Sequence, residues 1–506
     1  MELTELAGSL RLDKSKDLAL YVQVKELLLS HVDEGRLAKG DRLPPVRQLA
    51  QMLAVNVMTI AKAYKELAEL GVIRGRGALG TFVIGRASSP PLRPKPAEPV
   101  AQLGVTKEDY ARRDVDTFRR MLQVNEVPGV VPLTRAYPDT SVVDMKAFEQ
   151  VIRETLARRH PHTYAYISPS GLPSLRSAFS TMMRQWRDLD VDEDDIVVTG
   201  GGQQGLALIA HSLLKPGDVV LVERPTYFGA LDLFRSLGVL PVGVPMHPDG
   251  LDIEALGRLA ADSKPKLLFI NPTFQNPTGI TTSPEKRRAI LEFSRRYGIA
   301  IVEDDCCPEL RYRGEVIPSI KSIADDRDLV YYLTGMGKVY VPGIRLGLLV
   351  PPKPAVGDII KRKSVLDLHT SPLCQEAFAA YATLPSVQKN ITAARTVYRR
   401  LLDTVHRELT NVMPDGCEFE KPDGGLNIWV RLPRGVDAID FYLAALQRNV
   451  GILVGEHLFA DEADRRTFRL SFGYPDKARL IDGVRGLGSA ASALSARTTG
   501  SFAIVV

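Results

Sequence analysis

The sequence predicts a small, mainly α N-terminal domain linked to a large α/β domain that carries a smaller C-terminal α+β subdomain. Three observations predict this organisation. Short, fully apolar runs in the middle of the chain end in polar or glycine-rich turns, as strands of an open α/β sheet do. Basic residues gather near the N-terminus, within two helical patterns and a hairpin. A proline-rich stretch at residues 87–99 separates the two regions.

The N-terminal domain contains two helices joined by a turn. Residues 40–50 lead through a turn into a short helix with proline near its start. Asn56 stands where it can cap the second helix, which Gly71 ends. The apolar side of this second helix carries Ile60, Tyr64, Leu67 and Leu70 at helical spacing. Its opposite side carries Thr59, Lys62 and Lys65.

A basic hairpin follows the helices, at residues 72–77 (VIRGRG) and 80–83 (GTFV). Residues 36–86 hold nine Lys or Arg and three Asp or Glu, a net charge of +6, whereas the whole chain carries only +5. Such a concentration of positive charge is what a phosphate-binding surface requires. Two short helices and a basic hairpin are typical of a winged helix-turn-helix that binds double-stranded DNA. The alternative is a helical dimerisation or docking module with a solvated basic face.

Three stretches carry no clear domain pattern. Residues 87–99 (ASSPPLRPKPAEP) lack an apolar period and indicate a semi-rigid, extended spacer. Residues 101–127 have the composition of a polar, partly helical connector. The tail from Ser489 is small and polar until residues 502–506, so we expect either a frayed terminus or a late strand.

Four strand ends in the α/β domain carry candidate site residues. Residues 196–204 (IVVTGGGQQ) pass through a glycine-rich turn into a helix, which presents backbone N–H groups to an anion such as phosphate. Residues 271–279 (NPTFQNPTG) and 303–307 (EDDCC) put polar groups beyond apolar strands, where open α/β sheets bind ligands. Residues 330–338 (VYYLTGMGK) end in Lys338. A partly desolvated lysine amine suits an imine bond to an aldehyde cofactor, although each segment alone is also compatible with an ordinary turn.

The order of these motifs resembles the fold-type I pyridoxal-phosphate enzymes, the class I/II aminotransferases, over roughly residues 130 to 485. The resemblance implies that Lys338 forms the imine bond to pyridoxal 5'-phosphate. It implies that Asp304 pairs with the pyridinium nitrogen and keeps the ring an electron sink. It also implies that Asn276 hydrogen-bonds the phenolic oxygen of the ring and that Tyr227 stacks on the ring face.

The resemblance also assigns residues to the phosphate and to the substrate. The phosphate is expected to be held by backbone N–H groups and a charged fork from Gly201, Gly202, Gln203 and Arg345. Tyr166 resembles the tyrosine that reaches a phosphate across the dimer, so a homodimer is expected. Arg469 resembles the arginine that grips a substrate carboxylate, and a surface arginine on a strand is an equal alternative.

The sequence departs from this family's pattern at three places. Cys306 and Cys307 stand where the family usually has a tyrosine, and a thiol is a much poorer hydrogen-bond partner. Gly335 and Gly337 replace serine or threonine before the lysine. Ala136 replaces a glycine that often opens the substrate pocket. We therefore expect cofactor binding to survive and efficient transamination to be impaired.

Residues 43–50 (LPPVRQLA), 55–70 and 80–83 resemble the GntR family of bacterial repressors and activators. The resemblance implies that Arg47 and the start of the second helix meet the DNA, where Val57 replaces a frequent polar contact. The predicted DNA-binding residues are Arg47, Asn56, Thr59, Lys62 and Arg76. A GntR head joined to an aminotransferase-like body is the architecture of the MocR subfamily.

Length and composition agree with a multidomain protein of the bacterial cytoplasm. At 506 residues and 45% apolar content, two or three domains with sizeable cores are expected. No stretch resembles a transmembrane run or an export signal, so no membrane partner is expected. The four cysteines make no disulfide framework. No zinc spacing, Walker loop or Ser/His/Asp set is present, so no metal site is expected.

The predicted domains are the winged helix-turn-helix at 12–86, a linker at 87–127, a large cofactor domain at 128–370 and a small subdomain at 371–495. We expect a transcriptional regulator that binds pyridoxal 5'-phosphate through Lys338 and senses an amino-acid-like effector. Two heads of a homodimer would read repeated or inverted half-sites of an operator. One alternative is an active aminotransferase with Lys338 as its proton shuttle, and a weaker one is a cofactor-free body that only dimerises.

Overall fold

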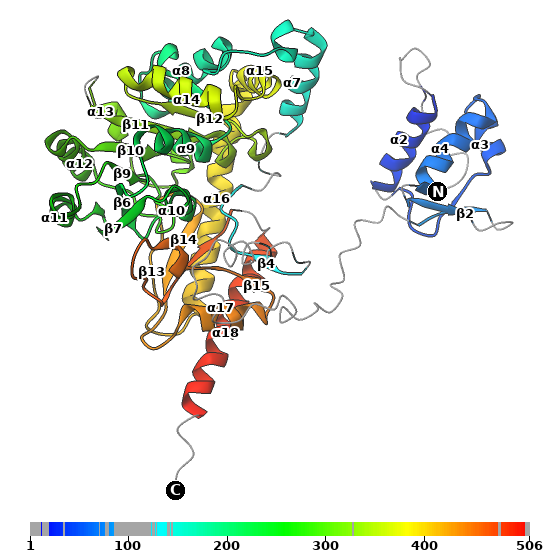
Figure 1. The fold of residues 1–506 in the computed structure, drawn as a ribbon. Helices are drawn as coiled ribbons and strands as arrows, with labels where there is room; N and C mark the ends of the chain where they lie inside the picture. The colour runs from blue at the N-terminus through cyan, green and yellow to red at the C-terminus, as the bar shows by residue number, and fades with distance from the viewer. Residues whose placement is uncertain are drawn as a thin grey trace. The chain divides into compact units, whose positions relative to one another are not determined.

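The chain forms two compact units, Met1–Ala97 and Glu98–Val506 (Figure 1). The computed structural model describes the following residues: 20–33, 36–69, 71–75, 80–84, 129–138, 145–325, 328–473 and 477–500, with Leu12, Gln123, Val127 and Val142 as single positions. Within these ranges, none of the helices has both the length and the apolar character that a membrane span needs.

The described part of the first unit has three helices and a small antiparallel sheet. These are α2 (Leu20–Asp33), α3 (Val46–Met52), α4 (Val57–Glu69), β1 (Arg42–Leu43), β2 (Ile73–Gly75) and β3 (Thr81–Val83), with strand order β1-β3-β2. Helices α3 and α4 and the β2–β3 hairpin confirm the predicted winged helix-turn-helix. Helix α2 was not predicted, although its buried Val24 and Leu28 share one core with Leu49 and Leu67.

Local contacts fix the start and end of α4. Asn56 caps the helix as predicted, because its Oδ1 accepts a hydrogen bond from Met58 N at 2.8 Å. Gly71 follows the helix with φ +68°, a left-handed conformation that glycine adopts freely. The hydroxyl of Tyr64 donates to the carbonyl of Pro44 at 2.9 Å and so ties α4 to the start of α3.

The second unit is built on an eight-stranded sheet with helices on both faces (Figure 1). The strand order is β5-β12-β11-β10-β9-β6-β7-β8. The strands are β5 (Val197–Thr199), β6 (Val219–Arg224), β7 (Leu240–His247), β8 (Gly250–Leu251), β9 (Leu267–Ile270), β10 (Ala300–Asp304), β11 (Val330–Gly335) and β12 (Gly347–Val350). The five neighbouring strands β11, β10, β9, β6 and β7 are parallel to one another. Strand β12 is antiparallel to both of its neighbours, β11 and β5.

Both faces of this sheet are covered, so its strands are apolar on both sides. In β9, Leu267 and Phe269 enter one core, whereas Leu268 and Ile270 enter another. The first core includes α9 (Gly202–Leu213), α10 (Phe228–Ser236) and α14 (Val356–Leu366). The second includes α11 (Ile253–Ser263), α12 (Pro284–Tyr297) and α13 (Ile320–Ile323). The predicted large α/β domain is confirmed.

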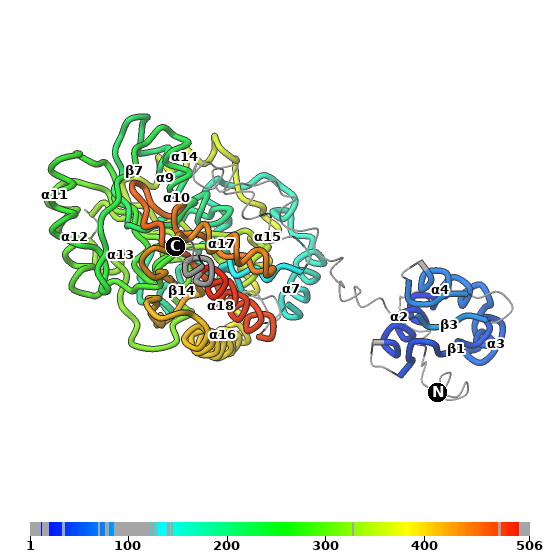
Figure 2. Tube along the Cα trace, turned by 90° about the horizontal axis from the view of Figure 1, so that it is seen from below, coloured from blue at the N-terminus to red at the C-terminus, as the bar shows by residue number. Residues whose placement is uncertain are grey.

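A smaller α+β part completes the second unit, as expected. Its sheet has the order β13-β14-β17-β16. The elements are β13 (Glu418–Phe419), β14 (Asn427–Arg431), β16 (Leu453–Val454), β17 (Thr467–Ser471), α16 (Pro385–Val412), α17 (Ala438–Leu446) and α18 (Lys477–Gly500). Nearby, β4 (Val131–Pro132) pairs in parallel with β15 (Val450–Gly451). Helices α16 and α18 lie side by side (Figure 2).

The small, polar tail from Ser489 is helical as far as the structure describes it, and the frayed terminus or late strand expected at residues 502–506 stays a prediction. Helix α18 continues to Gly500, and residues 502–506 lie outside the described residues. The physical reason is packing, because Ala490 and Ala491 are buried in the main core and tertiary contacts outweigh weak helix propensity.

Helix α15 (Pro372–Ala382) packs on α7 (Met145–Arg158) and α8 (Pro173–Arg187), so the chain just after residue 370 still contacts the large domain. The domain boundaries remain predictions.

Candidate functional site

The candidate site lies at the sheet edge where β5, β9, β10 and β11 end. Strands β9, β10 and β11 are parallel neighbours. Strand β5 has the same direction as β11, because β12 between them is antiparallel to both. The polar segments that follow these four strands therefore meet at one edge, as the sequence predicted.

Lys338 ends the short 3-10 turn Met336–Lys338 that follows β11. Its side chain is partly buried, and Nζ donates a hydrogen bond to the carbonyl of Ala136. Burial lowers the pKa of Lys338, and Arg469 lowers it further, while Cys306, Cys307 and Asp304 oppose the shift. A lowered pKa increases the fraction of neutral amine, which is the nucleophilic form.

Asp304 offers a carboxylate with no hydrogen-bond donor among the described residues. Burial raises the pKa of Asp304 to about 7, the neighbouring Asp305 raises it too, and Lys338 opposes the shift. The backbone carbonyl of Asp304 accepts from Asn271 Nδ2, which fixes the strand end. A bound cation would find in Asp304 an unpaired acceptor that ionises readily beside positive charge.

Arg469 reaches the site from β17 of the smaller part. Its Nη1 donates to Asn276 Oδ1 at 2.8 Å, and its Nη2 donates to the carbonyl of Thr134 at 2.5 Å. The side chain is only 3% exposed, so the alternative of a surface arginine is wrong. Its Nε is buried without a hydrogen-bond partner among the described residues, and burial lowers the pKa of Arg469 to about 10, against the opposing effect of Tyr227. Such a group is suited to bind a carboxylate.

The glycine-rich turn lies at the start of α9 and forms a close cradle with the side chain of Arg345. Gly201 has φ +115°, and a Cβ there would lie 2.9 Å from Arg345 Nη2. The same nitrogen donates to the carbonyl of Gly200 at 3.3 Å. Gln203 directs its side-chain amide to the carbonyl of Gly229 at 2.8 Å. Gly202 is the first residue of α9, so the turn presents backbone N–H groups and a guanidinium to one region, as an anion site does.

Tyr227 precedes α10 and is partly buried. Burial raises its pKa to about 12, with Asp304 and Cys306 adding to the shift, so these groups share one environment. A Cβ at Gly229 would lie 2.5 Å from the Tyr227 hydroxyl oxygen, so glycine is required there for this ring orientation.

Tyr166 lies apart from this cluster. It is 84% exposed, and its ring centroid is 5.6 Å from that of His369 in an edge-to-face arrangement. Among the described residues, no hydrogen bond or ring contact joins it to another candidate residue, and its role across a dimer remains a prediction.

Sequence reasoning missed a buried network that supports Asn276. Asn271 Oδ1 accepts from the backbone N–H of Asn276 at 2.7 Å, and Asn271 N donates to Glu223 Oε2 at 3.1 Å. Gln275 Nε2 donates to the same Glu223 oxygen at 3.0 Å. Burial raises the pKa of Glu223 to about 8. The one available signal was an acidic residue inside the apolar strand β6.

The first unit exposes several of its predicted DNA-binding residues. Arg47 is exposed on α3, and Lys62 is exposed on α4 with its ammonium 3.7 Å from the ring centroid of Tyr21. Thr59 is partly buried, and Asn56 is exposed while it caps α4. Arg76 lies outside the described residues. At the start of α4 the side chains of Val57 and Met58 are 43% and 72% exposed, so an apolar surface stands beside the basic one.

Comparison with known proteins identifies both parts of the chain. The family described as Aminotransferase class I and II matches residues 136–480. The chain belongs to this family. Residues 20–83 match the family of bacterial regulatory proteins called gntR. The predicted union of a GntR-type regulator with a class I/II aminotransferase-like body is therefore confirmed.

Two relatives and one solved structure illustrate this similarity. Aromatic-amino-acid aminotransferase 1 of Thermococcus litoralis is 30% identical over 73% of this chain and 90% of its own. The probable rhizopine catabolism regulatory protein MocR of Rhizobium meliloti is 25% identical over 96% of both chains, which agrees with the MocR-type architecture. The Pyrococcus horikoshii kynurenine aminotransferase, solved in complex with PMP, aligns with TM-score 0.72 and 28% identity over 78% of this chain and 98% of its own.

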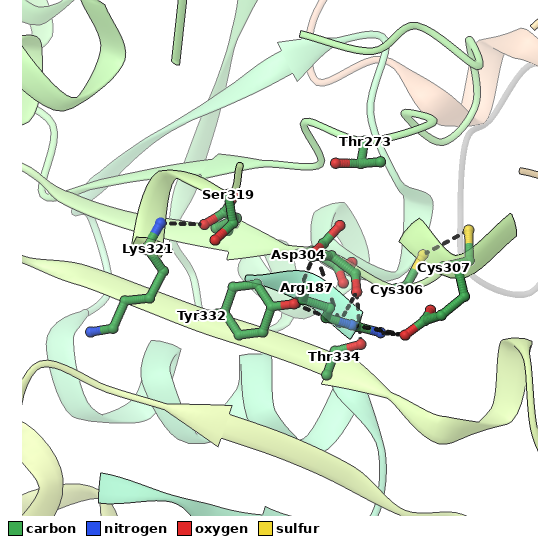
Figure 3. Close-up of polar contacts among 12 residues, drawn as sticks. Arg187, Thr273, Asp304, Cys306, Cys307, Ser319, Lys321, Tyr332 and Thr334 are labelled. Carbon is green, nitrogen blue, oxygen red and sulfur yellow. Dashed lines mark hydrogen bonds and ion pairs between the residues drawn. The ribbon is translucent and has the colours of Figure 1, made fainter. Parts of the chain in front are cut away.

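The departures from the aminotransferase pattern have structural counterparts. Cys306 and Cys307 are free thiols with sulfur atoms 3.9 Å apart, and their mutual contact and burial hold the pKa of Cys306 well above its usual value. A Cβ at Gly335 would lie 3.4 Å from Gly202 N, so the missing side chain faces the start of α9. Thr334 does not replace it, because its buried hydroxyl donates to the carbonyl of Asp305 at 2.7 Å (Figure 3).

Removal of the Asp304 charge should stabilise the cofactor-free protein at alkaline pH. The folded-state pKa is about 7, against about 3.9 in an unfolded chain. Between these values the folded state holds a proton that the unfolded state has released, so the free energy of unfolding falls as pH rises through this window. We expect Asp304→Asn to be more stable than wild type at about pH 8 by on the order of 1–2 kcal/mol, with the difference vanishing near about pH 4.

Urea unfolding followed by tryptophan fluorescence measures this difference, since both tryptophans, Trp186 and Trp429, lie in the second unit. The exposed Asp190→Asn is the matched control and should show no such pH dependence. A difference between Asp304→Asn and wild type that is constant across this pH range would contradict the proposed protonation of Asp304.

Proposed function

We propose that the aminotransferase-like body of this regulator binds pyridoxal 5'-phosphate and senses an amino compound, whose presence alters DNA binding by the GntR-type unit. One observation carries this proposal. A lysine of lowered pKa, an unpaired carboxylate and a buried arginine converge beside a glycine-lined helix start, in a chain that also carries a DNA-binding unit.

The residues fit the cofactor group by group. Pyridoxal phosphate supplies, when bound, an aldehyde that reacts with amines and a ring that delocalises electrons. Lys338 would hold it covalently, and Asp304 would keep its ring nitrogen protonated. Asn276 would hydrogen-bond the phenolic oxygen, and Tyr227 would stack on the ring. The phosphate would meet Arg345 and the backbone N–H groups of Gly201, Gly202 and Gln203, since the Gln203 side chain is engaged elsewhere.

The effector is proposed to carry a carboxylate as well as an amine. In the part of the chain that the structure describes, the buried Nε of Arg469 has no partner, and a carboxylate there would satisfy it with a charge-assisted hydrogen bond. Lys338, the group that would meet the amine, contacts the carbonyl of Ala136, two residues from the carbonyl that Arg469 contacts. An amino acid joins these two chemical groups at the required short separation.

An active aminotransferase is the second candidate, favoured by Lys338 and by the similarity to aminotransferases over most of the chain. Against rapid turnover stand the thiols at Cys306 and Cys307 and the absence of a hydroxyl side chain at Gly335. A thiol binds a phenolic oxygen poorly, so the electronic state of the ring would be less well controlled. Binding needs only the anchors that remain, and for this reason we favour a sensor.

We further propose a homodimer in which Tyr166 of one copy reaches the phosphate of the other. Its exposure leaves its hydroxyl available to a second chain. Two DNA-binding units would then contact repeated or inverted half-sites. Because its target is bacterial DNA, the protein would act in the cytoplasm. The linker at 87–127 and the subdomain division near residue 370 belong to the same proposal.

Substitution of Lys338 tests the cofactor assignment. Wild-type protein purified with pyridoxal phosphate should show a visible absorbance band that Lys338→Ala abolishes, because the covalent link is lost. The exposed Lys361→Ala should keep the band. Addition of single amino acids should alter the wild-type band without build-up of 2-oxo acid. Formation of more than one 2-oxo acid molecule per protein molecule would instead establish the aminotransferase. A band that persists in Lys338→Ala would refute the assignment of Lys338.

Substitution of Arg469 tests the carboxylate site. In Arg469→Gln the absorbance band should remain, while the concentration of amino acid that alters it rises roughly 10- to 100-fold, because a hydrogen bond to a charged group is lost. The matched control ligand is the amine that corresponds to the amino acid without its carboxylate. Its weak effect on the band should be the same in wild type and in Arg469→Gln. An equal rise in the required concentration for the amino acid and for the amine would mean that Arg469 only shapes the pocket.

Arg47→Ala tests the DNA-binding surface. We expect affinity for a duplex selected from a random pool by the wild-type protein to fall by roughly 10-fold or more, with the absorbance band unchanged. Arg153→Ala removes an equal charge from an exposed site in the second unit and should leave DNA affinity intact. Unchanged affinity in Arg47→Ala, measured by fluorescence anisotropy, would contradict the docking surface.

A further inference from the structure

A cavity lies beside the segment that follows β10. It has a volume of about 220 Å³ and is bounded by the end of α8, by the chain around residues 308–319 and by α16. None of Lys338, Asn276 and Arg469 lines it, so it is separate from the candidate cofactor site. The charged and aromatic side chains of its wall that carry the argument are Trp186, Arg187, Asp305, Arg311, Arg313 and Arg395. We call it the arginine cavity.

Two of its four arginines are neutralised by carboxylates. Arg187 donates to Glu309 Oε1 from Nε at 2.9 Å and from Nη2 at 2.6 Å. Arg313 Nε lies 3.6 Å from Asp423 Oδ1. Asp305, the acidic residue of the wall, accepts a hydrogen bond from Tyr332 through Oδ2, which lies 3.8 Å from Arg187 Nη1, while its Oδ1 is buried without a partner among the described residues.

The other two arginines have no carboxylate partner within the described residues. Arg395 donates a hydrogen bond only from Nε, to the backbone carbonyl of Glu309. The guanidinium of Arg311 makes no hydrogen bond to the described chain and lies 4.8 Å from the ring centroid of Phe274. Both side chains are partly buried. Burial lowers the pKa of Arg311, and Arg287 and Arg395 lower it further, against the opposing effect of Asp423 and Asp305.

We propose that the arginine cavity binds a small dianionic oxyanion, an inorganic phosphate or a dicarboxylate. The guanidinium of Arg311 and the two Nη groups of Arg395 carry N–H donors without partners among the described residues, and such donors suit the paired oxygens of a dianion. The volume is below that of sites for drug-sized ligands, so it suits an anion of a few heavy atoms. This binding does not depend on the cofactor, and its failure would leave the proposed sensor function untouched.

Trp186 provides a direct reporter, because it lines the cavity and the chain has only two tryptophans. Full-length Trp429→Phe protein is titrated with phosphate, with succinate and with chloride at constant ionic strength. We expect saturable fluorescence changes with at least one dianion and none with chloride. Phosphate alone would indicate a phosphate or phosphomonoester ligand, and succinate alone an organic acid. A response that chloride reproduces would overturn the proposal.

Variants in the same background assign the site. Arg311→Gln and Arg395→Gln, made singly, should each raise the half-saturating concentration at least 10-fold. Arg184→Gln on α8 removes an exposed arginine outside the cavity and should have no effect, as should Arg345→Gln in the phosphate cradle. Circular dichroism establishes folding, and Arg311→Lys, which keeps the charge but loses the fork, replaces Arg311→Gln if that variant unfolds. Unchanged affinity in both cavity variants would also overturn the proposal.

Discussion

The site depends on how the protein separates three consecutive carboxylates at the end of β10. A buried carboxylate is costly unless donors or cations compensate it. Glu303 accepts from two backbone N–H groups at the start of α13, each at 2.8 Å. Asp305 accepts from Tyr332 at 2.9 Å and stands beside Arg187. Asp304 alone has no donor among the described residues. One of the three carboxylates therefore remains available to a ligand, while hydrogen bonds hold the other two in place.

The same division explains what could be predicted from sequence. The convergence of the segments that carry Lys338, Asp304 and Asn276 could be predicted because each lies at or beyond a strand end, and parallel strands bring their ends together whatever the loops do. The arginine cavity was not found, since Arg187 is 118 residues from Asp305 and 145 from Tyr332, and no local pattern marks such a contact. Helices α2 and the end of α18 were missed because buried contacts, rather than caps or strong periodicity, hold them.

The residues that this chain keeps and those that it lacks, relative to the aminotransferase pattern, bear differently on cofactor binding and on catalytic turnover. The groups proposed to anchor the cofactor are present and converge on one sheet edge, and they are supported by the buried Glu223, Gln275 and Asn271 network. The missing groups are the tyrosine hydroxyl, in whose place Cys306 and Cys307 stand, and the small hydroxyl side chains before Lys338. A regulator that binds DNA in response to a ligand needs the residues that hold the cofactor and a site that reacts with amines. It does not need fast release of product.

The proposed sensor also has a physical route from ligand to linker. Lys338 donates to the carbonyl of Ala136 and Arg469 to that of Thr134, so both ligand-facing cations hold one short segment, which follows the connector from the DNA-binding unit. While Lys338 holds the cofactor covalently it would not donate to Ala136, and an amino compound that takes its place on the cofactor would return the lysine amine to that carbonyl. A hydrogen bond to a charged group contributes about 1.5–3 kcal/mol, against about 5.5 kcal/mol for a nearly complete reversal of a two-state equilibrium. This one hydrogen bond would therefore shift the equilibrium of the segment by roughly 10- to 100-fold without reversing it completely.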